Sequence, residues 1–248
     1  MVTIQREVDD TSRTASIQTY ARIAGVLLLV SLVAGGFGEA YAPSTLIVSG
    51  NATATAHNIM VSDVLFRLGF LGYLIEAACD VTLTFLLYVL LQPVHARLAL
   101  LAVLFRIMAT ATFAFAELFY FAPSLILGGA GYLQTFSINQ LHTLALLSLT
   151  VYGFASSFSS LFYGIGSLLL GYLLVRSGYL PRSLGVLWMI GGIGFVAGIV
   201  VLVLAPTYAS PLLQVPTVLG LLFLAIWLLI RGVDVDKWSE RIQLPVSP

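Results

Sequence analysis

The chain has 248 residues, of which 59% are hydrophobic and 9% are charged, and its 11 basic and 11 acidic residues cancel. A soluble domain carries roughly 25% charged residues, so this composition excludes an ordinary soluble protein and predicts a membrane protein. No basic stretch indicates a nucleic-acid partner, and the single cysteine, Cys79, excludes an internal disulfide.

Six hydrophobic runs are long enough to cross a bilayer, which takes about 20 apolar residues in a helix. They cover residues 20–41, 64–91, 97–122, 152–176, 183–204 and 212–231. We therefore predict an all-α, polytopic membrane helical bundle of six transmembrane helices over residues 20–231. A polar tail at 1–19, disordered or interfacial, precedes the bundle, and a short tail at 232–248 follows it.

The first run has two features of a secretion signal. Arg22 precedes the apolar stretch of this run, and Ala40-Tyr41-Ala42 resembles a small-residue cleavage site. However, Pro43 would follow the cut, and the run is long enough to span a bilayer, so we expect it to remain as a helix.

Residues 138–151 directly precede the fourth run and are moderately apolar. A single helix over 138–176 would be about 58 Å long, which is too long for one span. We predict that 138–151 form a separate helix at the surface of the bundle.

The placement of lysine and arginine predicts the orientation, because cytoplasmic connections are enriched in these residues. Nine of the eleven lie on one side of a six-span chain, namely Arg6, Arg13, Arg22, Arg97, Arg176, Arg182, Arg231, Lys237 and Arg241. The connections 42–63, 123–151 and 205–211 contain none. We therefore predict a multi-pass protein of the cell (inner) membrane with both termini in the cytoplasm.

Three further segments, together with the opening run, carry a family resemblance. They are "LLYVLLQPVHARLALLAVLFR" (Leu86 to Arg106), "GIGSLLLGYLLVRSGYLPRSLGVL" (Gly164 to Leu187) and "LLIRGVDVDKW" (Leu228 to Trp238). The chain resembles the bacterial membrane-protein family called domain of unknown function 4386. The resemblance implies a multi-span inner-membrane protein without an established activity, so no catalytic residue carries over. Members often have a glutamate three residues after the arginine that matches Arg106, where this chain has Ala109.

Ionisable side chains inside a bilayer are costly, which makes them the first candidates for function. Glu76 and Asp80 are four residues apart on one predicted helix, hence on one face. On the next helix, Arg106 lies within about 3 Å of the depth of Asp80, by the rise of an α-helix. We predict an Asp80–Arg106 ion pair and a buried polar cluster of Glu76, Asp80 and Arg106 as a candidate binding site.

Two interpretations of this cluster stay open. In the first, its three side chains line a polar path that binds an anion, moves protons or holds the headgroup of a substrate. In the second, Asp80 and Arg106 only lock the hairpin between their helices, and an Arg67–Glu117 pair does the same near the outer surface.

A second candidate site, the outer polar cluster, comprises Arg67, Glu117, Glu39 and His142. A metal-dependent enzyme would need about three histidine or carboxylate ligands to converge there, with His57 and Asp63 as further donors. The chain contains no ligand-spaced motif, nucleophile elbow or nucleotide fingerprint. We therefore expect no catalytic residue, no metal site and no cofactor.

A stripe of small residues on the fifth run favours close packing of helices, either inside the bundle or across a dimer. It consists of Gly191, Gly194 and Gly198. The lipid bilayer is one expected partner, and a second copy of the chain or another membrane protein is a further one. We assign no small-molecule ligand.

Three functions fit these features. They are a structural, sensory or partner-binding protein, a small-molecule or ion transporter with a polar site on the hairpin of the second and third spans, and an intramembrane enzyme with an outer-facing site. We see no inverted repeat or paired broken helices of the kind that transporters show. We therefore favour the first function.

The predicted topology has a direct test. A reporter that is active only in the cytoplasm is fused after Gln92 in one variant of the chain and after Ala130 in a second variant. The two fusions should give opposite signals, because the two connections are predicted to lie on opposite sides of the membrane. Equal signals from the two fusions would contradict six spans with both termini inside.

Overall fold

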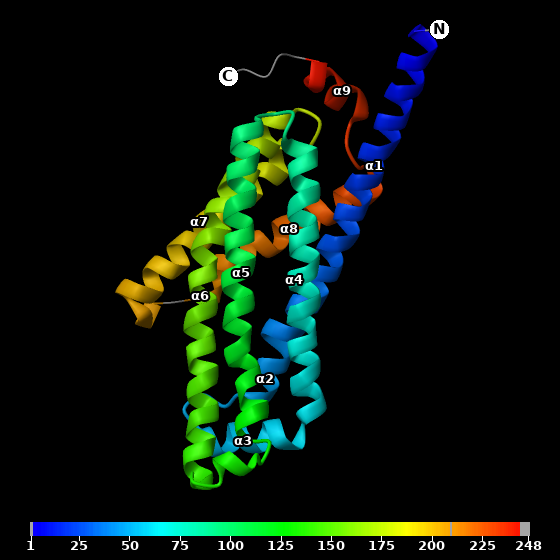
Figure 1. Cartoon of the computed structure of the whole chain (residues 1–248). Coiled ribbons are helices and arrows are strands. Elements are labelled where there is room, and N and C mark those ends of the chain that lie inside the picture. Colours follow the sequence, from blue (N-terminus) through cyan, green and yellow to red (C-terminus); the bar gives the residue numbers. More distant parts are fainter. Residues whose placement is uncertain (1, 209, 244–248) are drawn as a thin grey trace. The chain divides into compact units, whose positions relative to one another are not determined.

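A computed structural model describes residues 2–208 and 210–243, with side chains described for 16–208, 210 and 212–242. All regular elements in this part of the chain are helices (Figure 1). The α-helices are α1 (Val2–Gly35), α2 (Ala42–Leu46), α3 (Ala52–Val61), α4 (Asp63–Leu91), α5 (Ala96–Ile126), α6 (Ile138–Ser177), α7 (Arg182–Leu204), α8 (Val215–Ile230) and α9 (Val235–Gln243). A π-helix, η1 (Gly36–Tyr41), joins α1 to α2, and short 3₁₀ turns are η2 (Gly131–Leu133), η3 (Pro206–Tyr208) and η4 (Pro211–Gln214).

Six helical stretches are long and apolar enough to cross a membrane, as the sequence predicts. They are Ser16–Leu46, Asp63–Leu91, Ala96–Ile126, Ile138–Ser177, Arg182–Leu204 and Leu212–Ile230. Many of their apolar side chains point outward, for example Phe85, Leu104 and Val203. Such a surface suits acyl chains rather than water, so the chain is a multi-pass membrane protein built as a helical bundle.

The prediction of a separate surface helix at 138–151 is wrong. These residues are the first part of α6, which runs for 40 residues without interruption. The helix contains no proline to break it, and its glycines each cost only about 1 kcal/mol in a helix. At about 60 Å, α6 is roughly twice as long as the bilayer core is thick, so it either tilts strongly or extends past the apolar layer.

Both predicted tails contain helix. α1 begins at Val2, within the tail predicted at 1–19. The C-terminal tail predicted at 232–248 contains α9, and residues 244–248 of that tail lie outside the described residues.

The chain divides into two compact units, which we treat separately. Unit 1 contains residues 1–29, 79–108 and 160–248, and unit 2 contains residues 30–78 and 109–159. The helices α1, α4, α5 and α6 contribute residues to both units.

In unit 1, the C-terminal segment is fastened to the core by hydrogen bonds. The carbonyl of Leu90, at the end of α4, accepts from the Tyr179 hydroxyl at 2.6 Å and from the Trp238 indole at 3.3 Å. Burial raises the pKa of the Tyr179 phenol, which keeps it protonated as a donor. The Gln18 side chain donates to the Arg231 carbonyl and accepts from the Val233 amide, each at 3.1 Å.

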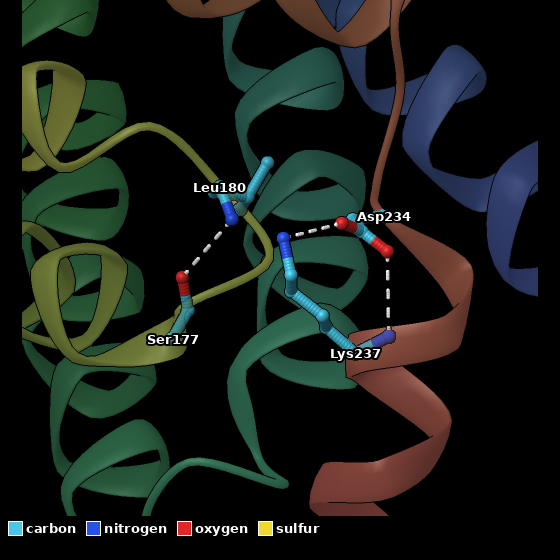
Figure 2. Close-up of polar contacts among 4 residues, drawn as sticks. All are labelled: Ser177, Leu180, Asp234 and Lys237. Atoms are coloured by element: carbon cyan, nitrogen blue, oxygen red, sulfur yellow. Dashed lines mark hydrogen bonds and ion pairs between the residues drawn. The ribbon is translucent and has the colours of Figure 1, made fainter.

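The beginning of α9 is capped by an aspartate (Figure 2). One carboxylate oxygen of Asp234 accepts from the Lys237 amide at 3.3 Å, and the other pairs with the Lys237 ammonium at 2.7 Å. Hydrogen bonding to Lys237 lowers the pKa of Asp234. In the turn before α7, the Ser177 hydroxyl accepts from the Leu180 amide at 3.3 Å. Both contacts satisfy amides that a helix end or turn would otherwise leave open.

In unit 2, glycines let the start of the chain approach α4 closely. A Cβ added to Gly38, in η1, would lie 2.8 Å from the Gly69 carbonyl, and one added to Gly72 would lie 2.8 Å from the Ala34 carbonyl. Such contacts between small residues are common in membrane bundles. The π-helix widens the backbone at this contact.

We predict that Trp238 anchors the C-terminal segment. Replacing Trp238 with Ala should reduce the free energy of unfolding by about 3–5 kcal/mol, because a buried ring is removed and leaves a cavity. The measurement is thermal or denaturant unfolding of the purified protein in detergent. Trp238→Phe, which keeps the ring but not the hydrogen bond, should cost clearly less. A similar cost for the two variants would show that the packing of the ring contributes little.

Candidate functional site

The predicted ion pair between α4 and α5 is present in unit 1. Arg106 Nη2 lies 3.2 Å from Asp80 Oδ2. The two helices form a hairpin around the turn that contains Gln92 and His95, and the similar distance of each residue from this turn brings the two charges to one level. The depth argument from the sequence is therefore confirmed for Asp80 and Arg106.

The guanidinium of Arg106 has a further partner that the sequence argument missed. Its central carbon lies 4.1 Å from the centroid of the Tyr163 ring on α6, within range of a cation–π interaction. The stem of Arg106 packs on Gly166, where an added Cβ would lie 3.1 Å from Cγ. With these neighbours, the Arg106 side chain is only 1% exposed. The sequence contains one signal for this contact. Tyr163 lies in the middle of a predicted span, whereas tyrosine usually prefers the membrane interfaces.

Glu76, the third member of the predicted buried cluster, belongs to unit 2. Its carboxylate lies against α1, where a Cβ added to Gly35 would be 2.7 Å from one carboxylate oxygen. A role for Glu76 in binding stays a prediction.

The predicted Arg67–Glu117 pair is wrong. Arg67 instead pairs with Asp63 at 2.7 Å, and both side chains are about half exposed. The two residues are four apart at the beginning of α4, where the helical repeat places them side by side. Arg67 therefore pairs with a neighbour on its own helix, Asp63, instead of with Glu117 on α5.

Glu117, on α5 in unit 2, is 1% exposed, and its Oε1 has no hydrogen-bond partner in the described part of the chain. The same unit contains a cluster of three tyrosines, Tyr73, Tyr120 and Tyr152. The hydroxyl of Tyr152 donates to that of Tyr73 at 2.6 Å, and the ring of Tyr120 lies 4.9 Å from that of Tyr73. Nothing in the sequence pattern predicted this cluster.

The remaining members of the outer polar cluster do not form a metal centre. His142 is half-buried, and its Nδ1 has no hydrogen-bond partner among the described residues, while Glu39 is exposed in η1. Among the described side chains, no group of three histidine, cysteine or acidic residues could hold a metal ion. The converging ligands that an outer-facing metalloenzyme needs are therefore not brought together by these residues.

The small-residue stripe of α7 lies against α8 and the turn before it in unit 1. A Cβ added to Gly191 would collide with Thr217, and one added to Gly194 would collide with the Leu213 carbonyl. Gly198, by contrast, faces open space. At Gly191 and Gly194, close packing inside the bundle is therefore confirmed.

We predict that the Asp80–Arg106 pair matters more as a pair than as two separate charges. Arg106→Met should destabilise the protein by about 3–5 kcal/mol, because it leaves the Asp80 carboxylate without its ion-pair partner. The double variant Asp80→Leu, Arg106→Met should recover most of this loss, because no uncompensated charge remains. Thermal unfolding in detergent gives both values.

The control for this prediction is Glu76→Gln, which keeps shape and removes one charge outside the pair. It should be tolerated better than Arg106→Met. Equal tolerance of the two changes would indicate that Arg106 faces water.

Comparisons with known proteins show which family the chain belongs to. No solved structure matches the chain. An uncharacterised protein of Archaeoglobus fulgidus is 31% identical over 175 residues, which cover 70% of this chain and 88% of that protein. The family described as "Domain of unknown function (DUF4386)" matches residues 23–232. With most of its length matched, from the first span to the end of the last, the chain belongs to this family.

Proposed function

We propose that this protein is a structural or partner-binding component of the cytoplasmic membrane, with both termini in the cytoplasm, and that its buried charges hold the bundle together rather than act on a substrate. The observation that carries the proposal is the enclosure of Arg106. Its guanidinium forms an ion pair with the Asp80 carboxylate and lies over the Tyr163 ring, and its side chain is almost fully buried.

A charge that binds a transported solute has to meet water or the solute at some stage of the cycle. Arg106 would have to separate from Asp80 to do so, which would leave two uncompensated charges in an apolar bundle. Since such separation is strongly unfavourable, an ion pair with a fully buried arginine suits a permanent structural contact better than a changing binding site.

The orientation in this proposal depends on the basic residues that flank the spans. Of these, Arg22, Arg97, Arg176, Arg182, Arg231, Lys237 and Arg241 are at the ends of membrane-spanning helices or in α9. Their one-sided distribution supports cytoplasmic termini. The side chains of Arg6 and Arg13, which belong to the same argument, lie outside the described residues.

Transport through the hairpin is the competing function, and water access separates the two. In a variant in which Cys79 is replaced by Ala, we would introduce Thr84→Cys and, separately, Ala109→Cys. Thr84 lies one turn beyond Asp80, and Ala109 lies one turn beyond Arg106, so that the two positions flank the pair on opposite sides. Both side chains are buried.

The reagent is a small, charged thiol-specific methanethiosulfonate, applied to the protein in lipid nanodiscs, where both membrane faces are open to it. We expect neither Thr84→Cys nor Ala109→Cys to react while the protein stays folded. The matched control is Ser137→Cys, since Ser137 is exposed directly before α6 and its variant should react fully. Rapid reaction at either buried position would reveal a water path to the pair and would favour a transporter.

A further inference from the structure

A pocket of about 550 Å³ lies between α7 and α8 in unit 1. Apolar side chains line most of it, including Leu187 on α7 and Phe223 and Ile226 on α8. Its polar residues come from one end of the helix pair, where α7 begins and α8 ends. These are Ser183 and Arg231.

Along α8, the lining runs from Phe223 to Arg231. This length of helix corresponds to about 12 Å, so the pocket extends from the membrane boundary into the apolar layer. Phe223, Ile226 and Ile230 remain exposed along this length, and Ile230 is 72% exposed. In a membrane these side chains face acyl chains. The pocket is therefore an indentation of the lipid-facing surface.

Arg231 brings a free positive charge to the polar end. In the part of the chain that the structure describes, its guanidinium makes no ion pair and no hydrogen bond. Its backbone, by contrast, is held firmly. The amide donates to the Trp227 carbonyl at 2.8 Å, and the carbonyl accepts from Gln18 at 3.1 Å. The backbone therefore positions Arg231 at the mouth of the pocket, and its guanidinium has no counterion among the described residues.

The other polar groups at this end favour the same type of ligand. The Ser183 hydroxyl is exposed and can donate to an anionic oxygen. Arg182, next to it in the chain, adds a second positive charge at the beginning of α7. None of the described residues that line the pocket is acidic. The indole of Trp227 donates to the Gly232 carbonyl at 3.1 Å, which fixes the ring as part of the pocket wall.

From this combination we infer that the pocket between α7 and α8 binds an anionic phospholipid, with the phosphate at Arg231 and Ser183 and an acyl chain along Leu187, Phe223 and Ile226. Charge complementarity selects an anionic headgroup, since a basic residue at the membrane boundary attracts anionic lipid. The apolar, lipid-facing lining selects a molecule with an acyl chain over a free anion. The inference needs only that α7 and α8 span the membrane, so it does not depend on the orientation or on the role of Arg106.

The test uses the purified full-length protein, stripped of lipid in detergent. Phosphatidylglycerol and phosphatidylcholine with identical acyl chains are added in turn, and bound lipid is counted by native mass spectrometry. We expect the wild-type protein to retain phosphatidylglycerol in preference to phosphatidylcholine. Arg231→Gln should weaken phosphatidylglycerol binding about tenfold, the effect of losing one charge-assisted contact.

Two further variants keep the result specific to the pocket. Arg97→Gln removes the same charge from an exposed arginine at the beginning of α5, outside the pocket, and should bind phosphatidylglycerol like the wild type. Leu187→Trp fills the apolar part of the pocket and should reduce retention while Arg231 remains. Circular dichroism checks that all variants keep their helix content.

Three results would overturn the inference. Equal retention of the two lipids would remove the need for a cationic site. Equal losses from Arg231→Gln and Arg97→Gln would mean that anionic lipid surrounds the protein without a defined position. A disulfide between two copies of an Ile226→Cys variant with Cys79 replaced, formed with or without added lipid, would make a second copy the occupant.

Discussion

A guanidinium in the middle of an apolar bundle has to be neutralised where it lies, and the Asp80–Arg106 contact sets the conditions for much of unit 1. The contact fixes the register of α4 against α5, since the two side chains have to reach one level. It also determines what α6 presents to them, namely the face of Tyr163 and the bare backbone of Gly166. A larger residue at Gly166 would press on the arginine stem. The burial of Arg106 therefore constrains three helices together, namely α4, α5 and the adjacent part of α6.

The membrane itself made much of the fold predictable. Apolar runs of sufficient length have to become helices, because a bilayer leaves no other way to satisfy backbone groups, and the six predicted runs correspond to six spans. The Asp80–Arg106 pair followed from helical rise alone. The same reasoning failed at 138–151, because length was used to divide α6 while no residue in the segment breaks a helix.

The parts that could not be predicted depend on side-chain directions between helices that are distant in sequence. A similar depth in the membrane suggested that Arg67 and Glu117 could form an ion pair. Depth, however, says nothing about which face of a helix a residue occupies. In the structure, Arg67 pairs with Asp63, one helical turn away. Two contacts depend on how α6 is rotated about its axis, which the evenly apolar sequence of α6 does not reveal. One is the contact of Tyr152 with Tyr73 in the tyrosine cluster, and the other is the contact of Tyr163 with Arg106. The pocket at Arg231 likewise arises from the shape of two packed helices.

The hydrogen bonds that fasten the C-terminal segment to Leu90 and Gln18 have a consequence for biosynthesis. Unit 1 combines residues 1–29 with residues 160–248, and Gln18, in the first span, forms its hydrogen bonds with residues that lie 213 and 215 positions later. The indole that reaches the Leu90 carbonyl belongs to Trp238 on α9, which lies 148 positions after Leu90 in the chain. During insertion, the first spans therefore enter the membrane with this end of the unit still open. Closure has to wait until α9 has been synthesised and has left the ribosome, so a chain that stalls before α9 cannot form the contact between Trp238 and Leu90.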